Sequence, residues 1–207
     1  MARVTGPLMS IDASGTLAGA LVFAKWRGRN YVRRHAVPSN PRTASQVSSR
    51  AIMKFVGSDW KNVPDLDKAT WEESAAAKKV SPFNEYIAAN CRNWRDGIPP
   101  AQQTPPARIL VPGTIGVLVV VVSGRQLIVT VPHPPNGLDW GFVLCRFPTT
   151  GFTPGPANAI AVVVGNEPSV DYADGPLAPG EYFYNAYAIT TDGLAGTPGT
   201  EDSGTVT

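Results

Sequence analysis

Histidine and cysteine are scarce in this chain of 207 residues, which holds two of each. His35 and His133 lie far apart in the sequence, and Cys91 and Cys145 do not have the short spacing of metal-binding cysteines. The sequence therefore predicts no metal site and no cofactor. Because we place the cysteines in different modules, a disulfide between them is not favoured, and we interpret both as free, buried thiols.

Motifs of catalysis are missing as well. Asp171, Asp174 and Glu181 could cluster in a loop, but their pattern is more typical of a solvated loop surface. The glycines near residues 14–15 and 193–196 lack the strand-to-helix setting of a phosphate-binding loop. Since no nucleophile has a base at a recognisable spacing, we expect no catalytic residues and no enzymatic activity.

Long apolar runs are also absent. The longest, Ile115 to Val122, has eight residues and is predicted to form a buried strand, since a membrane-spanning helix needs roughly 20. Leu17 to Ala24 follows Asp12 and leads into a basic segment, which is unlike a secretory signal. We expect no membrane contact and synthesis in the cytoplasm.

Negative charge is nearly missing from the first quarter of the chain. Residues 1–58 carry nine Lys and Arg against the single Asp12, a net charge of +8, whereas residues 98–207 carry three positive and eight negative charges. A chain polarised in this way suggests a basic interaction arm attached to a folded body.

The arm contains the pattern of a β-hairpin. Leu21 to Trp26 and Tyr31 to His35 are β-prone runs, and Gly28 and Asn30 between them accept the positive φ of a hairpin turn. Because two strands alone are only marginally stable in water, we expect residues 1–42 to be mobile alone and ordered by a partner.

Three short helices are predicted between residues 43 and 97. Thr43 and Gln46 have the spacing of a capping box at the start of the first helix, and Gly57 is a candidate stop. Acidic residues at its start and lysines at its end suit the helix dipole, and they predict a second helix over about residues 65–79.

The second and third helices have predicted core faces and a predicted start. In the second helix, Leu66, Ala69 and Ala76 are expected to face the core. Ser81 followed by Pro82 marks the start of the third helix, with Ser81 as its cap.

Proline dominates the second half of the chain, where fifteen of the twenty prolines lie after residue 97. Residues 98–106, IPPAQQTPP, predict a semi-rigid linker. Residues 107–207 show short β-prone runs separated by turn signals, which is typical of a β-sandwich that folds without the rest. The predicted strands cover residues 107–111, 115–122, 126–131, 140–147, 159–164 and 182–189. The predicted fold class is therefore α+β, with an extended basic arm and hairpin (1–42), three helices (43–97), a linker (98–106) and an all-β sandwich (107–207).

The sandwich resembles a known module. The segment from Gly175 to Ala188 combines a leucine, a Pro-Gly turn and an aromatic strand, and Asp192-Gly193 follows it. This pattern resembles the late strands of fibronectin type III modules, which are immunoglobulin-like sandwiches. The usual tryptophan of the second strand is missing, and Trp140 is expected on the third strand instead.

The first hundred residues resemble a family of bacteriophage and prophage proteins that begin SG.LG..VF...RG..YVR and continue with a Pro-Asn-Pro-Arg-Thr segment. The matching residues are Ser14, Gly15, Leu17, Gly19, Val22, Phe23, Arg27, Gly28, Tyr31, Val32, Arg33, Asn40, Pro41, Arg42, Thr43, Gln46, Arg50, Trp71, Phe83 and Asn84. The resemblance implies a structural role in the virion.

The arginines of the arm are the candidate binding residues, together with the aromatic residues beside them. We favour contact with an acidic protein surface. Binding of phosphates and bases by the guanidinium groups and rings is a weaker alternative, because the acidic sandwich would repel nucleic acid. An ordinary solvated strand face is a further alternative. The predicted partner-binding residues are Trp26, Arg27, Arg29, Tyr31, Arg33, Arg34 and Arg42.

These observations predict a virion protein that stabilises or decorates the capsid. Its partners would be the major capsid protein or other virion proteins, in multiple copies or as a homo-oligomer. A head-tail connector or tail component is the alternative within this class. Alternatives of other classes are a DNA-binding protein and a secreted adhesin or carbohydrate-binding module.

Overall fold

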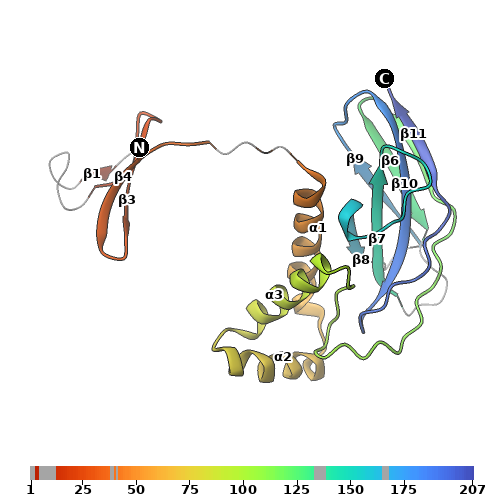
Figure 1. Cartoon of the computed structure of the whole chain (residues 1–207), viewed down its shortest axis with the longest axis horizontal. Coiled ribbons are helices and arrows are strands. Elements are labelled where there is room, and N and C mark those ends of the chain that lie inside the picture. The colour runs from red at the N-terminus through yellow and green to blue at the C-terminus, as the bar shows by residue number, and fades with distance from the viewer. Residues whose placement is uncertain (1–2, 5–12, 38–39, 41, 133–138, 165–167) are drawn as a thin grey trace. The chain divides into compact units, whose positions relative to one another are not determined.

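The chain divides into two compact units, Met1–Pro41 and Arg42–Thr207, which we call the N-terminal unit and the main unit (Figure 1). The computed structural model describes residues 3–4, 13–37, 40, 42–132, 139–164 and 168–207. The boundary between the two units lies within one residue of the predicted end of the arm.

The N-terminal unit is an antiparallel sheet with the strand order β1-β2-β3-β4. Its strands are β1 (Arg3–Val4), β2 (Ala13–Leu17), β3 (Leu21–Trp26) and β4 (Arg29–Arg34). Trp26 pairs with Arg29, so only Arg27 and Gly28 form the turn, with φ of 48° and 80°. Positive φ at both turn residues is the mark of a type I′ turn, which matches the twist of the strands. The predicted hairpin is therefore present, and β1 and β2 extend it.

Three helices follow: α1 (Ala44–Asp59), α2 (Asp65–Lys78) and α3 (Pro82–Arg95), with a 3₁₀ turn at Trp60–Asn62. Thr43 is the N-cap of α1, but its side chain makes no capping hydrogen bond, so the predicted capping box is wrong. Gly57 does not end α1. Because Val56 and Asp59 on either side of it are buried, tertiary packing outweighs the weak stop signal. Among the described residues, no helix is long and apolar enough to cross a membrane.

The buried face of α2 differs from the prediction. Leu66 is 83% exposed, and Ala69 and Ala76 are also exposed. Trp71 and Ala75, one turn apart, are buried instead, because the indole of Trp71 packs edge-on to Tyr86 of α3. The start of α3 is confirmed, since the Ser81 side chain accepts a hydrogen bond from the backbone N–H of Asn84 at 3.2 Å.

The rest of the main unit is a sandwich of two antiparallel sheets with the orders β5-β6-β9 and β11-β10-β7-β8. One sheet thus holds the first, second and fifth strands, and the other holds the seventh, sixth, third and fourth. This arrangement is that of an immunoglobulin-like, fibronectin type III-like sandwich, as predicted. The strands are β5 (Val119–Ser123), β6 (Gln126–Pro132), β7 (Asp139–Phe147), β8 (Ala159–Val164), β9 (Ser169–Asp174), β10 (Gly180–Thr190) and β11 (Asp202–Val206).

The sequence did not predict β9 or β11, and residues 107–111 are not a strand. Asp192, at the end of β10, holds this segment: its carboxylate accepts hydrogen bonds from the backbone N–H of Ile109 and Leu110 at 2.5 and 2.6 Å, and from the Thr190 hydroxyl. Burial raises the pKa of Asp192, but these hydrogen bonds outweigh burial, and the pKa lies below its ordinary value. The segment therefore bonds to a side chain instead of to a neighbouring strand.

Both faces of the four-stranded sheet are buried. One face packs against the three-stranded sheet. The core between the two sheets includes Leu127 of β6, Phe142 of β7 and Tyr184 of β10. The opposite face packs against the helices, which stand beside β7 and β8 in Figure 1. The residues that β7, β8 and β10 contribute to this second core are Trp140, Val143, Cys145, Ala159, Tyr187 and Ile189. The helices contribute Ile52, Phe55, Val56, Trp71, Tyr86 and Trp94. The expected separate modules 43–97 and 107–207 therefore form one unit with a shared core.

Trp140 lies on the third strand, as predicted, but a β-bulge directs it to the helices. Ile189 pairs with Gly141 and Thr190 with Asp139, so Trp140 is the extra residue. Its ring lies 4.6 Å from that of Phe55, between centroids. The bulge thus places a large aromatic side chain in the second core.

Residues 98–106 are not an exposed linker. Ala101 and Gln102 are buried, and Asn90 of α3 bonds to both the N–H and the carbonyl of Ala101. The Gln102 amide donates to Asp59 of α1 at 2.8 Å, and its backbone N–H donates to the carbonyl of Thr191. Because helix side chains satisfy its polar groups, this segment joins the helices to the sandwich.

Both cysteines are free, as predicted. Burial raises the pKa of the Cys145 thiol to about 12. Cys91 is only half-buried, which corrects the prediction for that residue.

Candidate interaction face

The N-terminal sheet presents basic and aromatic side chains on one face. Side chains of directly paired residues share a face of a sheet. Trp26 pairs with Arg29, Ala24 with Tyr31 and Val22 with Arg33. We call Trp26, Arg29, Tyr31 and Arg33 the basic-aromatic face. All four side chains are exposed, Trp26 by 64% and Tyr31 by 42%.

The turn adds a fifth predicted residue to this face. The Arg27 guanidinium lies over the Trp26 ring, 4.6 Å from its centroid, and this cation–π contact favours one orientation of the indole. A hollow of about 670 Å³ is lined by Trp26, Arg29, Asn30 and Tyr31. The tight turn therefore places two rings and the guanidinium groups of Arg27 and Arg29 at one end of the sheet, and Arg33 lies further along the same face.

Two of the predicted binding residues lie elsewhere. Arg34 pairs with Leu21, so its side chain is on the opposite face of the sheet. Arg42 belongs to the main unit, where its charge lowers the pKa of Tyr172, although burial raises that pKa overall. The sequence could not separate these two from the rest, because charge density alone does not show strand register.

The opposite face of the sheet carries apolar side chains beside Lys25 and Arg34, but it has almost no core. Leu17, Leu21 and Val32 are exposed, and Phe23 is the one buried side chain among the described residues of this unit. Burial of one such side chain stabilises the sheet by much less than the conformational entropy that is lost when its strands are ordered. Hydrogen bonds between the strands offset only part of this cost. The sheet therefore needs further contacts to persist.

The two units differ in charge. The N-terminal unit carries six positive charges and one negative charge, a net of +5, and the main unit carries twelve and fifteen, a net of −3. Guanidinium groups on a strand can bind carboxylates through paired hydrogen bonds, and exposed indole and phenol rings can pack into a partner pocket. The face is chemically suited to an acidic surface with apolar hollows.

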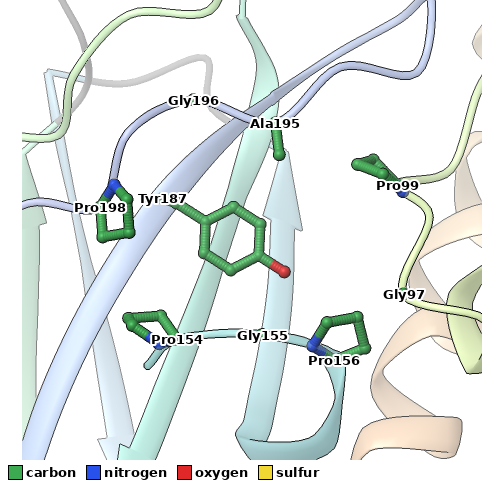
Figure 2. A pocket seen from close by; sticks show the side chains of 9 residues that line it. All are labelled: Gly97, Pro99, Pro154, Gly155, Pro156, Tyr187, Ala195, Gly196 and Pro198. Atoms are coloured by element: carbon green, nitrogen blue, oxygen red, sulfur yellow. The ribbon is translucent and has the colours of Figure 1, made fainter. Parts of the chain in front are cut away.

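A second hollow lies in the main unit, where α3 and the following loop approach the sandwich (Figure 2). It has about 220 Å³ and is lined mainly by proline and glycine around Tyr187, whose ring lies above Pro154 and Pro156 in Figure 2. This volume is below the roughly 300 Å³ at which small-molecule sites begin, and no charged side chain lines it. Nothing in the sequence pattern pointed to it. In the part of the chain that the structure describes, no three His, Cys, Asp or Glu side chains are placed to hold a metal ion.

No protein-family model and no curated protein matches the sequence. Among solved structures, the chain is similar to a Fn3-like protein from Clostridium thermocellum, with 21% identity and a TM-score of 0.37 over 45% of this chain and 92% of that chain. It is also similar to the FN1–FN3 domains of chicken CNTN1, with 15% identity and a TM-score of 0.37 over 46% and 32% of the two chains. A third is the chicken interferon gamma receptor alpha chain, with 16% identity and a TM-score of 0.36 over 45% and 52%. The fibronectin type III-like assignment of the sandwich rests on the strand order given above.

Proposed function

We propose that this chain is a structural protein of a phage particle that attaches through its N-terminal sheet to an acidic surface of the major capsid protein or another virion protein. The observation that carries the proposal is a sheet with almost no core that displays a basic-aromatic face. The resemblance of residues 14–84 to phage proteins supports the location. We favour a decorating or stabilising role on the capsid over a connector or tail position.

The composition of the face supports a protein partner. Trp, Tyr and Arg are the residues that most often dominate the energy of protein interfaces. A partner that covers the face can dehydrate the Trp26 and Tyr31 rings and pair Arg29 and Arg33 with carboxylates. An interface of on the order of 800 Å² on each side would add the burial that the sheet lacks.

Nucleic acid is the less favoured ligand of the same face. Phosphates would bind the arginines, but the main unit has a net charge of −3 and would repel a polyanion. A protein partner carries negative charge only in patches, so the main unit does not repel it over its whole surface. The two ligands make different predictions for arginine variants.

Replacing Arg29 and Arg33 by Ser is expected to weaken binding to the particle at least tenfold, because two charge-assisted contacts of roughly 1–2 kcal/mol each are lost. Binding of the unchanged protein should also weaken as salt rises, since salt screens the attraction between the basic face and an acidic partner. Occupancy on purified particles, measured by co-sedimentation over a range of protein concentrations, gives the affinity.

The double variant Arg34→Ser, Arg42→Ser is the matched control, because it also removes two arginines and both lie outside the face. It is expected to keep near-normal occupancy. Equal losses in the control and the face variant would show that only net charge matters, which contradicts the proposal. If the face variants lost DNA binding in a gel-shift assay and kept full particle occupancy, the nucleic-acid alternative would be correct.

A further inference from the structure

The outer face of the three-stranded sheet in the main unit carries a second unexplained surface. The register places Val121, Ile128 and Ala173 in one row across β5, β6 and β9. Val119, Thr130 and Asp171 form the next row, and Val117 lies two residues before Val119 on the same side. We call Val117, Val119, Val121, Ile128 and Ala173 the valine face.

The valines of this face are exposed to solvent. Val117, Val119 and Val121 are 67%, 52% and 53% exposed, whereas Leu118 and Val120, which alternate with them, are buried and half-buried. Val122, next to the turn between β5 and β6, is exposed on the other side of the strand. An antiparallel strand with one solvated face normally alternates apolar and polar residues, and a continuous apolar run is typical of a strand covered on both faces. The run from Val117 to Val122 has the apolar composition of a doubly covered strand, but among the described residues it is covered only at Leu118 and, in part, at Val120. This corrects the prediction that Ile115 to Val122 is simply buried.

The valine face is almost uncharged. The one charged side chain in its two paired rows is Asp171, which accepts a hydrogen bond from the Thr130 hydroxyl at 2.7 Å. Asp171 also lies on β9, the edge strand opposite β5, so the carboxylate is at the rim of the face. The rest of the main unit has an excess of acidic residues. A charged partner would find no counter-charges on the face, whereas an identical copy brings an equally apolar and uncharged surface.

We propose that the valine face binds the same face of a second copy of this chain, as two sheets packed about 10 Å apart around a twofold axis. This contact is independent of the proposed attachment through the N-terminal sheet. Three strands about 4.8 Å apart and some five residues long cover only a few hundred Å², which is less than the roughly 800 Å² of a standard interface. The dimer is therefore weak in solution, and it strengthens where many copies are held side by side on one surface.

Sedimentation velocity of the full chain, from about 5 to about 500 µM, tests this proposal. The expected result is a reversible monomer–dimer equilibrium that high salt does not weaken, because the face lacks ion pairs. Val119→Thr combined with Val121→Thr keeps the β-branched shape and removes apolar surface, so the double variant should dimerise at least tenfold more weakly. Leu66→Thr, which changes an 83% exposed leucine on α2, is the matched control and should dimerise normally.

Circular dichroism and a thermal melt establish that the double variant is folded. If it is not, Ala173→Lys, at an exposed position in the Val121 row, replaces it with the same expected loss of dimer. A protein that stays monomeric over the whole concentration range overturns the proposal. Association that survives the valine changes but disappears in the Arg29→Ser, Arg33→Ser variant also overturns it, because the contact would then run through the N-terminal sheet.

Discussion

A fragment of residues 107–207 is expected to lack a cooperative unfolding transition, whereas residues 42–207 should unfold in a single one. Without the helices, the second face of the four-stranded sheet is exposed to water. Five large side chains of that face, including Trp140, Tyr187 and Ile189, would lose burial worth roughly 1.5–3 kcal/mol each. That total, on the order of 10 kcal/mol, is as large as the whole free energy of unfolding of a typical domain.

Thermal and urea melts of the two fragments, followed by circular dichroism, make the comparison. Polar substitutions at Trp140 and Tyr187 in the shorter fragment control for aggregation. They reduce the apolar surface that is exposed without the helices, but they do not restore the missing core. A fragment of residues 107–207 with a melting temperature within a few degrees of the longer one would contradict the shared core. In that case the helices would be a separate module, as the sequence pattern suggested.

Asp174→Asn in the full chain is expected to lower the free energy of unfolding by about 3 kcal/mol. Asp174 lies on β9 of one sheet and is 8% exposed, and it forms an ion pair with Arg146 on β7 of the other sheet. The Tyr184 hydroxyl of β10 donates to the same carboxylate at 2.9 Å. The neutral amide would leave a partly buried guanidinium without its counter-charge between the sheets.

Urea denaturation measures this loss, and Asp171→Asn is the matched control. Asp171 lies on the same strand, but its carboxylate is exposed, and it accepts one hydrogen bond from Thr130. Its substitution should cost less than about 1 kcal/mol. Equal losses at the two positions would mean that the ion pair between the sheets contributes nothing of its own.

Local signals in the sequence predicted the helices and most of the strands. These signals are helix caps and chain reversals, which depend on residues close together in the sequence. Ser81-Pro82 starts α3, and Gly28 lies in the turn between β3 and β4, although Asn30, the other predicted turn residue, belongs to β4. These features depend on backbone geometry and on nearest neighbours. They do not require knowledge of the rest of the fold.

Long-range packing was not predictable in the same way. Gly57 and the proline-rich residues 98–106 looked like boundaries, but Asn90 and Asp59 bind the second segment into the main unit. The sequence could not show that the four-stranded sheet is covered on both faces, because apolar residues on a strand do not identify what covers them. The bulge at Trp140 is likewise visible only once the partner strand is known.

The candidate face was predicted in part. Arginine density beside Trp26 and Tyr31 pointed to the segment that forms the basic-aromatic face, while register was needed to place Arg34 on the opposite face and the unit boundary to place Arg42 in the main unit. The exposed side of the valine run was missed, since an apolar run of that length is ordinarily buried. In both cases, composition identified the segment and the strand pairing identified the surface.

Hydrogen–deuterium exchange of the N-terminal sheet, in the free protein and on the particle, tests the central claim most directly. Because this sheet has one buried side chain among its described residues, its amides from Leu21 to Arg34 should exchange far faster than those of β6 and β10 in the free protein. The same amides should become strongly protected when the protein is bound to particles. Protection in the free protein equal to that of β6 and β10 would contradict the claim, because the sheet would then be stable without a partner.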